Sequence, residues 1–232
     1  MRQIFPDLYM LAGLRVANVY LLAAPEGLTL VDTGMIGEAG KIGKELATAG
    51  YTVKDLRQIV ITHAHSDHTG SAAELVRLSG AKVLAHQAEV GYLAHTAFMP
   101  RRSRLQGFFL FLSEKVMPNP PALKVDVALE DGMVIPDTGG FTAVHAPGHT
   151  PGSLCLYHPG RRILICGDAL FNRHPLTGKK GLQPPLAFIS VDPAQVRESI
   201  RKLAALDVQV LLSGHGEPVL EKAEEKIREL GF

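Results

Sequence analysis

Thr62-His63-Ala64-His65-Ser66-Asp67-His68-Thr69-Gly70 concentrates three imidazoles and one carboxylate in a single short segment. Neutral imidazole is the commonest protein ligand for zinc, and a carboxylate adds the negative charge that suits a cation. The preceding Ile59-Val60-Ile61 predicts a buried strand, and residues 70–76 predict the start of a helix, with Ser71 and Glu74 at the spacing of a capping box. The segment therefore predicts a metal-binding loop between a strand and a helix.

Three more candidate ligands come directly after other strand-like segments: His149 after residues 141–145, Asp168 after 163–166, and His215 after 208–212. Loops at strand ends are where layered sheet folds usually gather their functional residues. Together with the histidine segment they provide five imidazoles and two carboxylates, which is enough for two metal ions.

Other short apolar segments predict further strands at residues 8–11, 16–22, 28–31, 81–85, 125–129 and 154–157. Helices are predicted at 36–49, 87–95 and 221–230, and one more begins at Asp192 with Pro193 in its first turn. Strands followed by a helix occur twice. This order predicts an α/β fold in which two similar layered halves share one core.

The composition is that of an ordinary globular protein. Hydrophobic residues make up 46% of the 232 residues and the formal net charge is +1, so no global field favours nucleic acid or an anionic membrane. No apolar run is long enough to span a bilayer, and residues 1–7 lack the basic and then apolar pattern of a secretory signal. We therefore expect a cytoplasmic protein that keeps Cys155 and Cys166 reduced.

The motifs taken together resemble the metallo-β-lactamase superfamily, in its binuclear hydrolase branch. The matching segments occur in the family's order and span most of the chain: Asp32-Thr33-Gly34, Thr62 to Gly70, Pro147-Gly148-His149-Thr150-Pro151-Gly152, Gly167-Asp168 and Gly214-His215-Gly216. Asn18-Val19-Tyr20-Leu21 also resembles the family's early strand. The combination is highly specific, whereas any one segment alone would be weak.

This resemblance implies a four-layer αβ/βα sandwich, in a single domain over residues 1–232, with the metals at one edge. It places one ion on His63, His65 and His149, and a second on Asp67, His68 and His215. Asp168 is expected to bridge both ions, and Asp32 to orient a ligand from behind.

The chemistry expected from the family follows from the two ions. Ions about 3.5–4 Å apart can hold a bridging water and lower its pKa from about 15.7 toward about 7. The resulting hydroxide would attack a carbonyl or phosphoryl centre, and Asp67 is expected to act catalytically by orienting it or by passing a proton to the leaving group. Two Zn²⁺ suit a nitrogen and oxygen donor set without cysteine, with Mn, Fe or Co as alternatives.

Departures from known branches of the family narrow the expected activity. Asp168 disfavours the true β-lactamases, which have no aspartate there, and intact His65 disfavours the flavodiiron branch, which has glutamate. Residues 167–171 resemble glyoxalase II, but the chain ends 17 residues after His215, so that enzyme's helical glutathione-reading domain is not expected. Acyl-homoserine lactonases carry a catalytic tyrosine where this chain has Phe171.

The expected function is therefore a metal-dependent hydrolase that uses a two-metal bridging hydroxide on a small ester, thioester or lactone. The alternative is a mononuclear iron persulfide dioxygenase, because that branch shares the histidine segment. A non-enzymatic metal-binding module is a third reading. Two zinc ions per chain would favour hydrolysis, and one iron would favour oxidation.

Residues 96–122 interrupt the strand pattern and predict an insert. Its apolar Phe108 and Phe111 predict a lid over the metals. A homodimer contact and a helix packed on the core are alternatives, and a membrane-surface contact ranks below the lid and the dimer because the basic cluster at 101–104 is short.

The walls of the substrate pocket are predicted from residues near the expected ligands. Phe171, Arg173 and His174 follow Asp168 closely. For Arg173 and His174 the alternative, equally weighted, is that they lie with two neighbouring lysines in a solvated loop and do not line the pocket. Four further histidines are expected to lie outside the metal site: His86, His95, His145 and His158.

Overall fold

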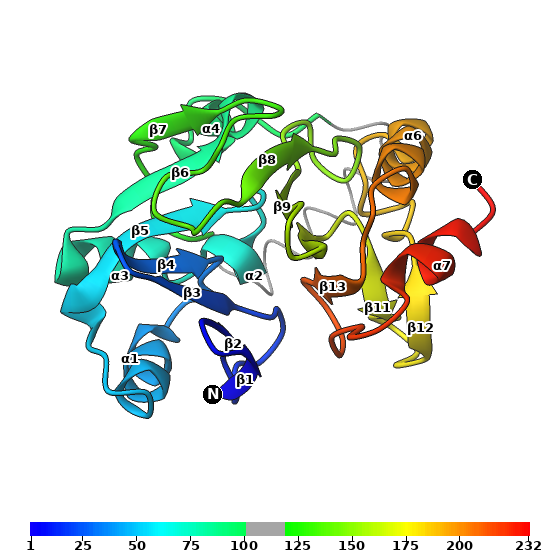
Figure 1. Ribbon diagram of the computed structural model, residues 1–232. Helices are drawn as coiled ribbons and strands as arrows, with labels where there is room; N and C mark the ends of the chain where they lie inside the picture. The colour runs from blue at the N-terminus through cyan, green and yellow to red at the C-terminus, as the bar shows by residue number, and fades with distance from the viewer. Residues whose placement is uncertain (101–118) are drawn as a thin grey trace.

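The computed structural model describes residues 1–100 and 119–232, and there it stacks two sheets between two groups of helices (Figure 1). The first sheet has the spatial order β1 (Arg2–Phe5), β2 (Leu8–Met10), β3 (Tyr20–Ala24), β4 (Gly27–Val31), β5 (Leu56–Ile61), β6 (Lys82–His86) and β7 (Val127–Leu129). The second has the order β13 (Val210–Ser213), β10 (Ile163–Gly167), β9 (Leu154–His158) and β8 (Thr142–His145). A separate hairpin pairs β11 (Phe171–Arg173) with β12 (Lys180–Gln183).

Helices cover the outer faces of the sheets, and the short helix α2 (Ser66–Thr69) lies at the sheet edge after β5. Those from the first half are α1 (Ala39–Ala47), η1 (Val53–Asp55), α2, α3 (Ala72–Ser79), η2 (Gln87–Glu89) and α4 (Val90–Leu93). Those from the second half are α6 (Pro193–Ala204) and α7 (Ala223–Arg228). In Figure 1, α1 and α3 lie at the left beyond the first sheet, and α6 and α7 lie at the right beyond the second.

Alternating side chains on the strands separate three apolar cores. Along β5, Ile59 and Ile61 pack with α1 and α3, whereas Val60 between them packs against the second sheet. Along β10, Ile165 joins the core between the sheets and Leu164 joins the core beneath α6 and α7. Because side chains of a strand point to alternate faces, these strands are apolar on both sides. Three cores between four layers confirm the expected αβ/βα sandwich.

The strand directions explain where the candidate ligands emerge. Strands β4 to β7 run parallel to one another. Strands β8, β10 and β13 share one direction, because β9 is antiparallel to β8 and β10 and β13 is parallel to β10. Parallel strands end at the same edge of their sheet, and the loops after β5, β8, β10 and β13 carry the predicted ligands. Each half therefore collects its ligands at one sheet edge.

Several predicted boundaries change in the structure. The helix expected at 36–49 is shorter, at Ala39–Ala47, and the metal segment itself winds into α2 rather than remaining a loop. Ser71 does cap α3, but the predicted capping box is wrong because its side chain makes no cap hydrogen bond. Its hydroxyl instead donates to Met35 O and accepts from Glu38 N. The tertiary contact with the neighbouring loop replaces the local one.

The predicted start of α6 is confirmed: Asp192 Oδ1 accepts from the N–H groups of Ala194 and Gln195, with proline in the first turn. Strands β1, β11 and β12 were not predicted, since they are short and only partly apolar. Cys155 and Cys166 are both buried and free.

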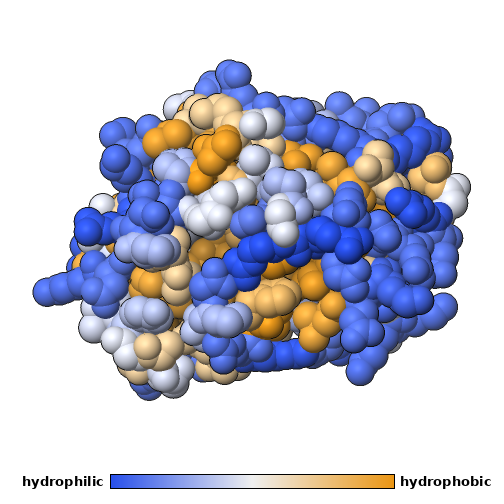
Figure 2. Space-filling model, viewed as in Figure 1, coloured by the Kyte–Doolittle hydropathy of each residue, from blue (hydrophilic) through white to orange (hydrophobic). Residues whose placement is uncertain are grey.

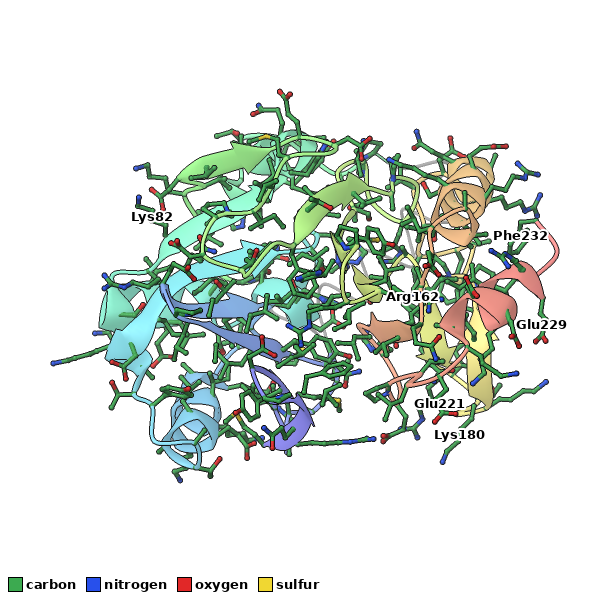
Figure 3. All side chains as sticks on the ribbon, viewed as in Figure 1. Lys82, Arg162, Lys180, Glu221, Glu229 and Phe232 are labelled. Atoms are coloured by element: carbon green, nitrogen blue, oxygen red, sulfur yellow. The ribbon has the colours of Figure 1, made fainter. Side chains whose placement is uncertain are left out.

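The outer surface is largely polar. Figure 2 shows hydrophilic residues over the left and right margins, with apolar residues gathered in the middle of this face. Arg162, labelled in Figure 3, lies in the turn before β10 and pairs with Asp207 and Glu224, so it ties the second sheet to α7. Among the described residues, no helix is both long and apolar enough to cross a membrane.

Candidate metal centre

Three imidazole nitrogens from both halves meet at one point. His65 Nδ1 lies 3.0 Å from His63 Nε2 and 3.0 Å from His149 Nε2. The outer nitrogens of two rings face hydroxyls, with Thr62 Oγ1 3.1 Å from His63 Nδ1 and Ser190 Oγ 3.4 Å from His149 Nδ1. A proton can bridge only one pair of nitrogens, whereas a divalent cation can accept all three lone pairs.

A second group lies beside the first. His215 Nε2 and His68 Nε2 lie 3.4 Å and 3.8 Å from Asp67 Oδ2. Asp168 stands between the groups, with Oδ2 3.2 Å from His215 Nε2 and 3.5 Å from His149 Nε2. The structure therefore brings together all seven residues that the sequence nominated as ligands.

Two buried atoms at this centre have no hydrogen-bond partner among the described residues, His68 Nε2 and Asp168 Oδ1. They lie 3.3 Å apart without hydrogen-bond geometry. An unpaired buried polar atom costs about 1–3 kcal/mol, so two such atoms facing each other are suited to bind a cation. Within each group the ligand-capable atoms all lie within 4.8 Å of one another. The donor set fits a divalent metal.

The pKa shifts of the metal-free protein divide the histidines into two kinds. Burial lowers the pKa of His149 to about 3 and also lowers the pKa of His65, which leaves both rings neutral with a lone pair to give. Burial opposes charge on His68 and His215 too, but Asp168 and neighbouring carboxylates outweigh it. They raise the pKa of His68 well above its ordinary value and the pKa of His215 to about 10. A cation must therefore displace protons from these two rings.

Asp32 supports this centre from behind. Its Oδ2 lies 2.7 Å from His68 Nδ1, and its two oxygens accept from the N–H and the hydroxyl of Thr62, both at 2.8 Å. A carboxylate on Nδ1 directs the Nε2 lone pair of His68 toward a metal. The geometry is the one expected for Asp32 in the sequence.

The loop of His215 is held by residues whose roles the sequence did not reveal. Asn18 Nδ2 donates to Ser213 O at 2.9 Å and to Gly216 O at 2.7 Å, and the Tyr20 hydroxyl also donates to Ser213 O at 2.7 Å. A Cβ added at Gly214 would collide with Asp168 Oδ1 and lie 2.8 Å from His68 Cε1. This glycine is therefore required by close packing.

A cavity of about 1130 Å³ opens over these side chains. Phe171, Arg173 and His174 all line it, as expected. Phe171 is buried, and its ring centroid lies 4.9 Å from that of His215. His174 also has a local role, since its Nδ1 accepts from two backbone N–H groups of the β11–β12 turn, at 3.2 Å each. Phe108 and Phe111, the expected lid, lie outside the described residues.

The four histidines expected outside the centre are separate from the two ligand groups. His86 and His145 stack on each other with ring centroids 3.8 Å apart, and His158 lies 3.0 Å from Gly139 O. His95 lines the cavity but belongs to neither ligand group. Two buried glutamates, Glu38 and Glu89, were not nominated at all, because nothing in their local sequence marks them.

Comparison with known proteins places these motifs in a family. Residues 12–215 match the family model described as the metallo-beta-lactamase superfamily. The chain is 32% identical over 225 residues to a probable metallo-hydrolase, YflN, of Bacillus subtilis, covering 90% of this chain and 83% of the relative. It is 33% identical over 153 residues to a hydroxyacylglutathione hydrolase of Pseudomonas aeruginosa, covering 65% of this chain and 43% of the relative.

Solved structures share the fold. A metallo-beta-lactamase family protein from Thermus thermophilus superposes with a TM-score of 0.73 at 25% identity, covering 98% of this chain and 79% of that one. TTHA1623, solved in a di-iron-bound form, superposes with a TM-score of 0.63 at 28% identity, covering 90% and 92%. The sequence match, the layered fold and the histidine and aspartate donor set agree, and the chain belongs to the metallo-beta-lactamase superfamily of metal-binding hydrolases.

Proposed function

We propose that the protein is a two-metal hydrolase of a small ester, thioester or lactone. In this proposal His63, His65 and His149 hold one divalent ion. Asp67, His68 and His215 hold the other, and Asp168 contacts both. The observation that carries the proposal is the position of the Asp168 carboxylate, whose oxygens lie 3.2 to 3.8 Å from histidine nitrogens of both groups.

Two divalent ions, when bound, supply an activated water and Lewis acidity toward a carbonyl oxygen. The chain's own residues position these groups and the substrate. Asp67 is the proposed catalytic carboxylate. Burial raises the pKa of Asp67, but His68 and His215 outweigh that effect and lower the pKa to about 2, so the group is an ionised acceptor. It lines the cavity, where it can orient water or take up a proton.

The cavity supports a substrate that carries an apolar portion. Its walls contain large apolar side chains from several elements: Met10, Leu14, Val16, Tyr92, Leu93, Phe171, Ile189 and Val191. The relative named hydroxyacylglutathione hydrolase supports an acyl ester or thioester, since its name describes cleavage of an acyl group from glutathione. The volume suits a small molecule rather than a polymer.

Zinc is the proposed metal, because the donors are imidazole nitrogens and carboxylate oxygens and zinc favours both. Iron is the competing metal, since one structural neighbour is di-iron-bound. Metal analysis of protein purified without added metal separates these cases. Two zinc ions per chain with hydrolysis of esters, thioesters or lactones support the proposal. A single iron with oxygen consumption on persulfides would replace it.

Asp168→Asn tests the two-metal arrangement. The amide keeps the shape of the side chain but removes the charge between the groups, so we expect loss of one ion and a fall in kcat of at least about 100-fold. The matched control is Asp131→Asn, an aspartate that pairs with Lys202 and does not line the cavity. Full activity in Asp168→Asn would refute the arrangement.

A further inference from the structure

Glu89 is a fully buried carboxylate at the end of η2, outside the proposed ligand set. It follows β6, a strand of the first sheet. Its partners among the described residues are the N–H groups of Ala64 and Gly152 and the side chain of Thr150, and none is a lysine, arginine or histidine, although a buried charge without a counter-charge is costly. Its presence there calls for a function.

Its two oxygens bind two different metal loops. Glu89 Oε2 accepts from the N–H of Ala64 at 2.7 Å, and Oε1 accepts from the N–H of Gly152 at 2.7 Å. Ala64 lies between His63 and His65, after a strand of the first sheet. Gly152 lies three residues after His149, after a strand of the second sheet. One side chain therefore joins the two loops whose three histidines converge.

The site is shaped for a glutamate. A Cβ added at Gly152 would lie 2.7 Å from Glu89 Cγ and 2.9 Å from Oε1, so only glycine permits this approach. Glutamine would fill the same volume, but its amide can accept one of the two N–H groups and would present a donor to the other. Only a carboxylate accepts both.

The burial of Glu89 disfavours its negative charge. Burial raises the pKa of Glu89, and hydrogen bonds from Thr150, Gly152 and Ala64 only partly offset it. The charge is thus poorly compensated in the metal-free protein. A cation held by His63, His65 and His149 would bring positive charge to the same two loops that Glu89 contacts.

We propose that Glu89 is a positioning residue that locks the loops of His63, His65 and His149 together and thereby sets the affinity of the ion they hold. It contacts no reacting atom. The inference rests on the proposed two-metal site. It predicts weaker binding of one ion only, whereas general destabilisation would weaken the binding of both.

The experiment isolates each ion. In a His215→Ala background, the complete ligand group that remains is His63, His65 and His149, and in a His149→Ala background it is Asp67, His68 and His215. We expect Glu89→Gln to weaken Zn²⁺ binding about 10- to 100-fold in the first background and to leave the second unchanged, as measured by competition with a chromophoric chelator.

A second readout needs no metal. In ¹⁵N-labelled apo-protein, amide protons bonded to a carboxylate resonate downfield. We expect the Ala64 and Gly152 signals to move upfield together in Glu89→Gln. The matched control is Glu38→Gln, which removes an equally buried carboxylate that binds Met35 N and Arg15 N instead. It should leave these amides and the first ion unchanged.

Equal affinity losses in both backgrounds, or the same loss in Glu38→Gln, would overturn the proposal, because both results indicate general destabilisation. Unchanged affinity in the His215→Ala background would also overturn it. If Glu89→Gln does not fold, Glu89→Asp carries the same test, since it keeps the charge but its shorter side chain cannot reach both N–H groups. A wild-type protein that binds two ions but hydrolyses nothing would refute the proposed function and leave this inference standing.

Discussion

Replacing Asp32 separates the structural and the metal-orienting effects of one carboxylate. Asp32 has a backbone φ of 62°, a conformation that asparagine adopts readily and alanine does not. Asp32→Asn therefore keeps the backbone and the bond from Thr62 N, but it places an NH₂ group where Oδ2 faces His68 Nδ1. Asp32→Ala removes every acceptor.

The magnitudes follow from the hydrogen bonds that each variant loses. In Asp32→Ala the N–H of Thr62 and Nδ1–H of His68 lose their acceptor, at about 1–3 kcal/mol each. The hydroxyl of Thr62 can turn to His63 Nδ1, 3.1 Å away, and so costs less. With about 1–2 kcal/mol for alanine in the left-handed conformation, the expected loss is about 3–8 kcal/mol, a large part of the usual 5–15 kcal/mol of a domain. Asp32→Asn should lose only about 1–2 kcal/mol, because neutral bonds replace charged ones.

Asp32→Asn should affect metal binding more strongly than it affects stability. In Asp32→Asn, His68 Nδ1 can accept a hydrogen bond from the new NH₂ group only when the neutral ring carries its proton on Nε2. A protonated Nε2 has no lone pair left for a cation. We expect Asp32→Asn to lower the affinity of one Zn²⁺ about 10- to 100-fold despite its modest effect on stability.

Urea unfolding of the metal-free variants measures the stability difference, and chelator competition measures the affinity of each ion. We expect the two assays to rank the variants differently: Asp32→Asn should lose little stability in urea but much of its affinity for zinc. Wild-type zinc affinity in Asp32→Asn would show that Asp32 does not orient His68. A stability loss in Asp32→Asn as large as in Asp32→Ala would show that the hydrogen-bond account is wrong.

Two further predictions concern the loop of Glu38 and the mouth of the cavity. Burial raises the pKa of Glu38, but hydrogen bonds from Met35 and Arg15 outweigh burial and lower the pKa below its ordinary value. The ionised Glu38 carboxylate therefore stabilises the fold above the unfolded pKa of about 4.3, and this stabilisation is lost as pH falls through the folded pKa. Urea titrations should therefore show the stability gap between wild type and Glu38→Gln closing below about pH 4, and a gap that stays constant to lower pH would contradict this sign. Arg173 lines the cavity and makes no ion pair with the described residues, so Arg173→Ala should raise KM about two- to fivefold for substrates with a carboxylate and leave neutral analogues unchanged. Lys180→Ala is the control, because Figure 3 shows Lys180 at the outer margin and it does not line the cavity. Equal effects of Arg173→Ala on charged and neutral substrates would refute the role of Arg173.

Much of the fold could be predicted because its signals are local. The alternation around Ile59, Val60 and Ile61 marks a strand with apolar faces on both sides, and Asp192 with Pro193 marks the start of α6. Ser71 shows the limit of such signals. Its spacing to Glu74 indicates a local cap, but a tertiary contact with Met35 supplies a better partner for the hydroxyl.

The sequence by itself determined which residues could form a metal centre, because imidazoles and carboxylates after strand ends are visible as residue types in fixed motifs. Only the tertiary structure decided how they are held. The contacts of Glu89 with Ala64 and Gly152, and of Asn18 with Ser213, join segments 25 to 195 residues apart. Such contacts depend on how two sheets pack, and a single buried glutamate or half-buried asparagine carries no local mark of a partner so distant in the chain.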